Sequence, residues 1–161
     1  EVIGSLYYIS EFLTKFFEDD VPNIITYDNL IAMLEFLEKN PYNMNELRWS
    51  FLIKSLSETG YLPNLDECSN CGKVFNKDDN IYISSREGWL FCYDCMEYKI
   101  DKKISSGTIN FLNLILNSDY KNIENLKVTL SVKEEIHNLF KTIIYGILGK
   151  EMKSEKMLNV L

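Results

Sequence analysis

Apolar residues recur every three or four positions over most of the chain, the spacing that places them on one face of an α-helix. The first such stretch covers residues 2–17 and is closed by a turn at Pro22. The second stops at Pro41 and has a broad apolar side, typical of a helix covered on more than one flank. The third ends at Gly60, which suits a left-handed helix stop. The pattern therefore predicts three helices here.

The helical pattern returns in the last third of the chain. Residues 105–116 lead from a polar start into a run of Ile, Leu and Phe, and a shorter helix is expected around residues 120–126. The last long helix is predicted to begin at a capping box formed by Ser131 and Glu134 and to end at Gly149. Its apolar positions follow one stripe, which should face the core.

The middle of the chain has a different pattern. Two short β-prone runs, residues 81–83 and 89–91, flank a turn that contains Gly88. Glycine readily adopts the positive φ that such turns require. The pattern predicts a small β-hairpin, with Trp89 packed on one face of it.

Four cysteines surround this hairpin, and they are the only ones in the chain: Cys68, Cys71, Cys92 and Cys95. Two Cys-x-x-Cys pairs at this separation are typical of one tetrahedral Zn²⁺ site. Two disulfides are the main alternative, but the chain has no apolar signal segment and is long enough to form a core without them. A redox-active Cys-x-x-Cys pair usually occurs singly. Because protein fills all four positions, the zinc is expected to be structural.

The predicted fold is therefore mainly α: a helical domain with an inserted small four-cysteine zinc module that contains a β-hairpin. Residues 1–65 form the first helical part, residues 66–98 the zinc-binding module, and residues 99–161 the helical part that completes the same domain. A hairpin of this size has almost no core, so metal binding must supply its folding free energy, on the order of 10 kcal/mol.

Charge is distributed unevenly. Residues 1–67 hold 12 acidic and 4 basic side chains, a net charge of −8, whereas residues 68–161 hold 12 acidic and 13 basic ones, a net charge of +1. Such an acidic chain is a poor non-specific binder of polyanions. It has no apolar run of membrane-spanning length, and the absence of a secretion signal indicates the cytoplasm. The start without Met, directly in a helical pattern, indicates a piece of a longer protein.

The chain has two groups of basic residues, and the first is a candidate contact site for phosphates or an acidic tail. They are also consistent with ordinary solvated surface, because acidic residues are interleaved with them, and cations are favoured at a helix C-terminus without any partner. The first group is Arg86, Lys99, Lys102 and Lys103, and the second is Lys141, Lys150, Lys153 and Lys156.

Residues 56–73, Leu-Ser-Glu-Thr-Gly-Tyr-Leu-Pro-Asn-Leu-Asp-Glu-Cys-Ser-Asn-Cys-Gly-Lys, closely resemble RecO, the family of DNA recombination and repair proteins. There a helix ends in Gly-Tyr-x-Pro and runs into the first cysteine pair, and a glycine-bearing hairpin precedes the second. The run Gly-Lys-Glu-Met-Lys-Ser at residues 149–154 is similar to the family's C-terminal signature. The resemblance covers essentially the whole chain in helix order.

The resemblance implies the C-terminal portion of a recombination mediator, without the family's N-terminal DNA-binding OB barrel. Such proteins anneal complementary single strands and, with RecR, help RecA to replace single-stranded DNA-binding protein. The implied partners are RecR, single-stranded DNA through the N-terminal domain, and the acidic tail of single-stranded DNA-binding protein, for which Lys150 and Lys153 are candidates.

An enzyme is not expected. The sequence has no glycine-rich phosphate loop, no nucleophile beside a base and no paired histidines. Its single histidine, His137, is expected at the edge of the core with a water or backbone partner. The alternative to a mediator is a stand-alone zinc-ribbon module that binds protein or nucleic acid.

Overall fold

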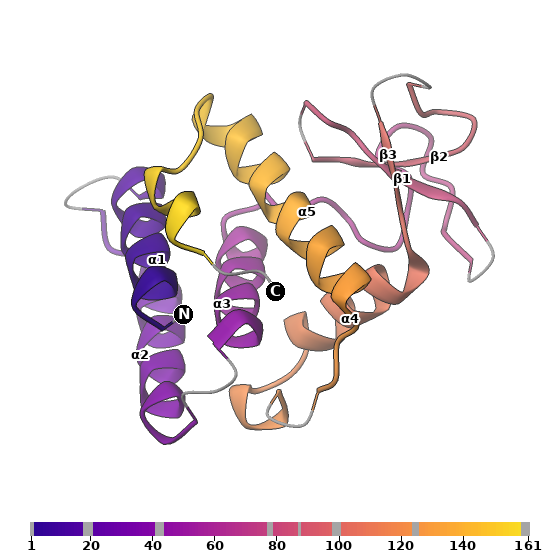
Figure 1. Cartoon of the computed structure of the whole chain (residues 1–161). Helices are drawn as coiled ribbons and strands as arrows, with labels where there is room; N and C mark the ends of the chain where they lie inside the picture. The colour runs from indigo at the N-terminus through magenta and orange to yellow at the C-terminus, as the bar shows by residue number, and fades with distance from the viewer. Residues whose placement is uncertain are drawn as a thin grey trace.

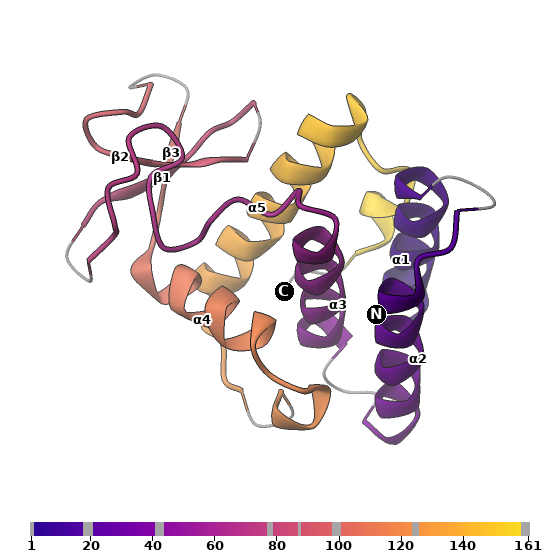
Figure 2. The same ribbon diagram turned by 180° about the vertical axis from the view of Figure 1, so that it is seen from behind.

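The computed structural model is a helical body with a small β-sheet at one end (Figure 1). In both ribbon views α1 and α2 lie at the end opposite the sheet, and α3 lies between them and the pair α4 and α5 (Figure 2). The structure describes residues 2–17, 21–40, 44–76, 79–86, 88–97, 101–123 and 126–158.

The three predicted N-terminal helices are α1 (Val2–Phe16), α2 (Ile24–Lys39) and α3 (Met44–Glu58). Asn23 caps α2, because its side chain accepts a hydrogen bond of 2.9 Å from the Thr26 N–H. The predicted stop of α2 at Pro41 lies outside the described residues; α2 itself ends at Lys39.

The central helix α3 is buried on almost all sides. It contacts α1, α2 and α4, and the chain's most deeply buried large side chains include several from this helix. Phe51 meets Phe12 of α1 edge to face, with ring centroids 6.4 Å apart. Trp49 is 1% exposed, so it is a core residue, as its place on the helical stripe predicts. After α3 the chain turns at Gly60, which has the expected positive φ of 74°.

The C-terminal helices are α4 (Ser106–Leu116) and α5 (Leu130–Leu148). A short 3-10 helix, η1 (Tyr120–Asn122), lies between them in the sequence, and a second one, η2 (Lys153–Met157), follows α5 and contacts α1. Gly149 ends α5 in the left-handed conformation, as predicted.

The capping box predicted for α5 is wrong. Thr129 is the N-cap, with an extended backbone and a side chain that accepts from the Val132 N–H at 3.4 Å. Ser131 therefore lies inside the first turn, where its side chain cannot cap the helix. The helix begins two residues earlier than predicted, because Thr129 has the extended backbone of an N-cap and its side chain bonds the first turn.

The sheet has three antiparallel strands, β1 (Ile81–Ile83), β2 (Leu90–Cys92) and β3 (Lys102–Ile104), in the order β2-β1-β3. Strands β1 and β2 form the predicted hairpin, in which Ile81 pairs with Cys92. The sequence pattern does not predict β3, which pairs with the other edge of β1 and lies beyond the predicted module limit of residue 98. The sheet buries one row of side chains: Ile81, Ile83, Leu90, Cys92 and Ile104.

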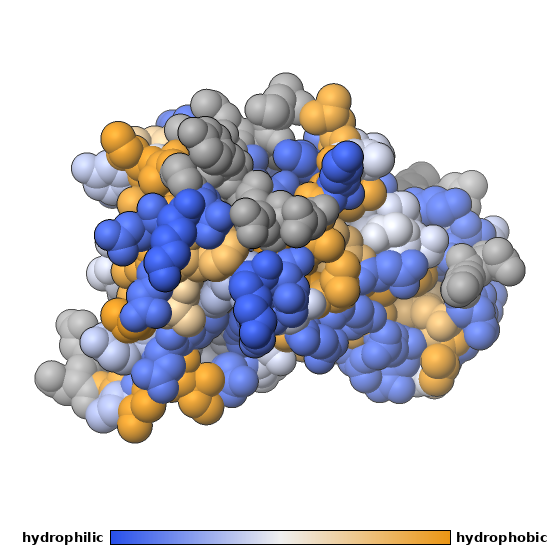
Figure 3. All heavy atoms as spheres, turned by 90° about the horizontal axis from the view of Figure 1, so that it is seen from below, coloured by the Kyte–Doolittle hydropathy of each residue, from blue (hydrophilic) through white to orange (hydrophobic). Residues whose placement is uncertain are grey.

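Apolar side chains also reach the surface of the helical body. The first turn of α2 is exposed at Ile24, Ile25 and Tyr27, although the helix contacts both α3 and η1. Seen from below, hydrophobic residues break the polar surface on the side of the molecule where α1 and α2 lie (Figure 3). Trp89 is 48% exposed, so the prediction that it is packed on the hairpin is wrong.

Candidate metal centre and contact surfaces

The four cysteines converge at one end of the sheet. Their sulfur atoms all lie within 4.8 Å of one another, and the thiols of Cys71 and Cys92 are 3.8 Å apart. A tetrahedron of sulfurs around Zn²⁺, with bonds of ~2.3 Å, has edges of roughly 3.8 Å. All four are free cysteines, so the disulfide alternative finds no support in this geometry. The four residues form a possible metal site whose spacing fits a tetrahedral dication.

Short backbone hydrogen bonds shape the first cysteine pair. The N–H of Gly72 donates to the carbonyl of Cys68 at 2.9 Å, and the N–H of Cys68 donates to the carbonyl of Lys73 at 2.9 Å. Gly72 has a positive φ of 71°, which lets the chain reverse directly after Cys71. The N–H of Ser69 then donates to the carbonyl of Leu90 at 2.8 Å and joins this loop to β2.

The second pair begins on the sheet itself. Cys92 is the last residue of β2, and its carbonyl accepts from the N–H groups of Cys95 and Met96, each at 3.1 Å. The strand thus positions Cys92, and the following turn brings Cys95 back to the same sulfur cluster. Burial differs among the ligands: Cys68 and Cys92 are buried, Cys95 is half-buried and Cys71 is exposed. One side of the site faces the protein and the other faces solvent.

The surroundings favour a thiolate at Cys68. Burial alone raises its pKa, but N–H groups of Cys71, Cys92 and Asn70 donate to its sulfur and lower the pKa to about 6. In contrast, the pKa of Cys95 rises to about 12: Asn70 donates to its sulfur and lowers the pKa, but burial and the three neighbouring thiols outweigh that bond. Burial likewise raises the pKa of Cys92. Four thiolates so close together therefore need a cation to ionise fully.

The cysteine module is attached to the helical body by two kinds of contact. Gly88 packs so tightly on α5 that a Cβ atom there would lie 2.4 Å from Cγ1 of Ile143. At the base of β3, the Glu135 carboxylate of α5 accepts from the Ser105 N–H at 2.9 Å and from the Thr108 hydroxyl at 2.5 Å. The same carboxylate thus fixes the start of α4, which directly follows the sheet.

The structure separates the predicted basic contact residues into two surfaces. Lys102 and Lys103 lie on β3 and line a cavity of about 430 Å³ between the sheet and α5, together with Lys141. Within the described part of the chain, neither Lys102 nor Lys103 forms an ion pair, whereas Lys141 lies 3.3 Å from Glu151. Arg86 is not part of this cavity.

The remaining predicted contact residues behave differently. Arg86 lies 3.8 Å from Glu97, with both side chains largely exposed. Lys150 and Lys153 are exposed and follow the end of α5. Lys99 lies outside the described residues. The structure therefore brings together the two strand lysines and Lys141, but it does not bring all the predicted residues into one patch.

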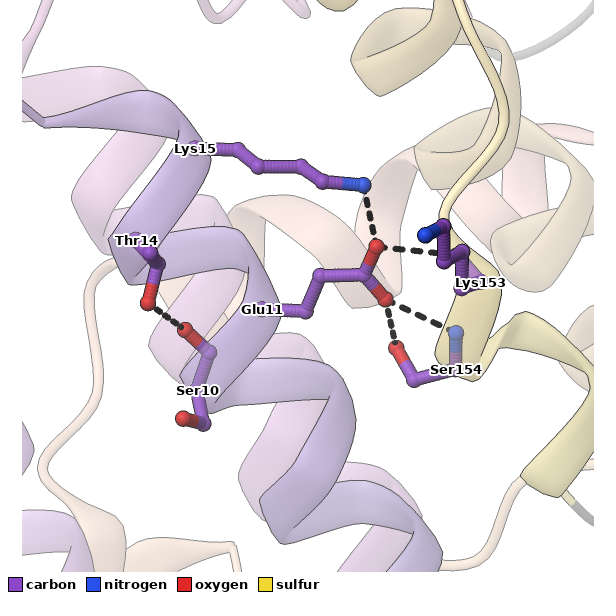
Figure 4. A network of polar contacts seen from close by, with 6 residues as sticks. All are labelled: Ser10, Glu11, Thr14, Lys15, Lys153 and Ser154. Carbon is purple, nitrogen blue, oxygen red and sulfur yellow. Dashed lines mark hydrogen bonds and ion pairs between the residues drawn. The ribbon is translucent and has the colours of Figure 1, made fainter.

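A carboxylate that no local sequence pattern indicates holds the C-terminal segment. Glu11 of α1 accepts from the backbone N–H groups of Lys153 at 2.9 Å and Ser154 at 2.7 Å, and from the Ser154 hydroxyl at 2.6 Å (Figure 4). Lys15 forms an ion pair with the same carboxylate. The Ser154 position of the C-terminal signature therefore has a structural role, since it anchors η2 to α1.

A second polar contact joins α5 to the same segment. Nε2 of His137 lies 2.9 Å from Oε1 of Glu155, a partner that sequence analysis did not predict. Glu155 also reaches Tyr8 of α1, whose pKa is raised first by burial and then by this carboxylate. Such contacts join residues far apart in the sequence, and no local pattern signals them.

Comparison with known proteins supports the resemblance seen in the sequence. The family model described as "Recombination protein O C terminal" matches residues 1–156. A protein from Caldanaerobacter subterraneus subsp. tengcongensis named "DNA repair protein RecO" is 30% identical over 149 residues, which is 92% of this chain and 59% of that protein. Its namesake from Dehalococcoides mccartyi strain CBDB1 is 28% identical over 155 residues, 96% of this chain and 60% of the relative.

The chain thus spans less than two thirds of the length of the curated relatives that it matches. No helix in the described part is long and apolar enough to cross a membrane. The family match extends over the helices on both sides of the cysteine module and over the module itself. The chain therefore belongs to the RecO family of DNA repair proteins and corresponds to that family's C-terminal portion.

Proposed function

We propose that this chain is the C-terminal scaffold and protein-interaction portion of a recombination mediator. The complete protein anneals complementary single strands and aids RecA loading on DNA covered by single-stranded DNA-binding protein. The observation that carries this proposal is the family match over residues 1–156, together with relatives named for DNA repair. The acidic character of the chain, with a net charge of −7, fits a portion that binds proteins more than DNA.

In this proposal the metal is Zn²⁺ and its role is structural. Cys68, Cys71, Cys92 and Cys95 would all be ligands, which leaves no open position for water or substrate. When bound, the ion supplies folding free energy to a sheet of three-residue strands and neutralises part of the thiolate charge. The chain is proposed to act without enzymatic chemistry, in the cytoplasm.

The proposed partners are RecR and the acidic tail of single-stranded DNA-binding protein, with single-stranded DNA bound mainly by the part of the protein outside this chain. For the tail we propose two contact surfaces. One is the cavity beside Lys102 and Lys103, where an apolar residue can enter while ammonium groups meet carboxylates. The other comprises Lys150 and Lys153, and Arg86 lies on a separate exposed surface.

A peptide titration tests these surfaces. The fluorescently labelled tail peptide should bind the chain, and Lys102→Glu with Lys103→Glu should weaken binding at least tenfold if the cavity is the site. The pair Lys150→Glu and Lys153→Glu tests the second surface. A matched control reverses the charge of Lys39, the last residue of α2, and of Lys121 on η1. Helix α2 lies at the end of the body opposite the sheet (Figure 1). Binding that all three double variants leave unchanged would exclude both surfaces.

The mediator activity itself needs the full-length protein. When complementary strands are coated with single-stranded DNA-binding protein, their annealing should require the full-length mediator. Equal annealing rates with and without the full-length mediator would contradict the proposed function. A full-length variant with both cavity lysines reversed should anneal bare strands normally and coated strands slowly, because only the coated strands require the tail contact.

A further inference from the structure

One hydrogen bond connects the two cysteine pairs through a side chain other than cysteine. Nδ2 of Asn70 lies 3.4 Å from the sulfur of Cys95, although the two residues are 25 positions apart. Asn70 is an exposed residue inside the first Cys-x-x-Cys loop, and Cys95 closes the second. The bond therefore crosses the site from one loop to the other.

In the described part of the chain, the other donors to these sulfurs that are not thiols belong to the backbone. The sulfur of Cys68 accepts from the N–H groups of Asn70, Cys71 and Cys92, and that of Cys92 accepts from the N–H of Asp94. Among the described residues, the donor other than a thiol that reaches Cys95 is the side-chain amide of Asn70. A substitution can therefore remove this bond while the backbone bonds remain in place.

We propose that Asn70 is a positioning residue of the metal site, whose amide donates to the metal-bound Cys95 thiolate and ties the two cysteine loops together. This inference rests on the proposed metal binding. Four thiolates around one dication leave a charge of −2, which outer hydrogen-bond donors stabilise. An N–H donor also withdraws charge from the sulfur it contacts, so the sulfur becomes a weaker nucleophile. Because Cys95 is only half-buried, that protection matters where solvent reaches the site.

Two substitutions at Asn70 separate this role from simple packing. Asn70→Ala removes the donor, and Asn70→Asp keeps the shape but places a carboxylate against a thiolate. We expect Asn70→Ala to lose roughly 10–100-fold in metal affinity, the usual cost of removing an outer partner of a ligand, and Asn70→Asp to lose more. Ser69→Ala is the matched control, because Ser69 lies in the same loop and its side chain has no hydrogen bond in the described structure.

The experiment measures three quantities on the purified chain. Competition with a chelator gives Zn²⁺ affinity, and Co²⁺ substitution gives the sulfur-to-metal charge-transfer band, which should shift to lower energy when the sulfur loses its donor. Mass spectrometry after brief alkylation identifies the cysteine that reacts first, and Asn70→Ala should speed the modification of Cys95 several-fold. Circular dichroism confirms that each variant keeps the helical body.

The outcomes distinguish two failures. If the wild-type chain binds neither Zn²⁺ nor Co²⁺, the proposed metal site itself is wrong. If the wild type binds metal and Asn70→Ala matches Ser69→Ala in affinity, in absorption band and in Cys95 alkylation, the role of Asn70 is overturned while the metal site stands. A shift in the absorption band and faster alkylation of Cys95 would support the hydrogen bond, since a merely structural residue would change neither at that one sulfur.

Discussion

At the residue scale, Glu11 shows how one carboxylate can hold a terminal segment in place. Burial alone raises its pKa, but hydrogen bonds from Lys15, Ser154 and Lys153 outweigh that effect and lower the pKa to about 2. We expect Glu11→Gln to destabilise the chain by roughly 1–2 kcal/mol at pH 7, because charge-assisted bonds become weaker neutral ones. Urea unfolding measures this loss. Glu38→Gln, at an exposed position on α2, is the control and should change little.

The same carboxylate should make stability depend on pH. A Glu pKa that is depressed in the folded state contributes stability above its ordinary value near 4.5, and that contribution is lost as the pH falls toward about 2. The wild type should therefore lose more stability than Glu11→Gln between pH 5 and pH 2.5. Unfolding free energies measured across that range check the difference. Parallel curves for the two proteins would show that η2 does not depend on the Glu11 charge.

Residues of the site differ in how far the sequence predicts them. The cysteines were predictable because each pair is local and the two-pair spacing has few other meanings. Glu11 was not, since its partner Ser154 lies 143 positions away and an acidic residue on a helix usually faces solvent. Asn70 lies between two ligands, but only the folded structure shows that its amide points across the site.

At the scale of elements, Gly88 is where the hairpin meets α5. Its φ is +75°, and a Cβ atom would lie 2.4 Å from a side-chain atom of Ile143 and 2.9 Å from its Cα. Gly88→Ala should cost more than about 2 kcal/mol, because backbone strain and overpacking add. Gly60→Ala is the matched control: its φ is +74° with nothing within 4 Å, so it should cost about 1 kcal/mol. Thermal and urea unfolding compare the two. Equal losses of stability would mean that α5 shifts to make room for the added methyl group.

The start of α5 gives a second test at this scale. Thr129→Ala should destabilise the chain by about 1 kcal/mol, because the Val132 N–H loses its acceptor. Ser131→Ala should be nearly neutral, since Ser131 is exposed in the first turn. Urea unfolding of both variants checks the order. A larger loss at Ser131 would restore the capping box that the sequence indicated.

The elements show the limit of local patterns. Strands β1 and β2 were predictable from β-prone residues around a glycine turn. Strand β3 was not, because Lys102-Lys103-Ile104 has one apolar residue and no alternation to read. It is a strand because Ile104 pairs with Ile81 and joins the buried row of the sheet. Tertiary contacts, and not β-propensity, decide whether such a short edge segment forms a strand.

At the scale of the whole molecule, the sheet and the helical body should differ in their dependence on metal. In the body α3 packs on α1, α2 and α4, and the buried row of the sheet adds to the same hydrophobic cluster. The sheet has strands of three residues each and one buried row of side chains, too little to fold without further support. This contrast follows from the predicted division into a coreless module and a helical domain, a division that remains a prediction.

Hydrogen exchange with and without a chelator tests that contrast. Metal removal should abolish protection of the Ser69 amide, which donates to Leu90, and of the amides that pair β1 with β2. Amides of α3 should exchange as slowly as before, because their burial does not depend on the cysteines. The double variant Cys71→Ser and Cys95→Ser should reproduce the chelated pattern without chelator. If instead α3 loses protection together with the sheet, the chain unfolds as one unit, and the contact of Gly88 with α5 transmits loss of the metal to the whole core.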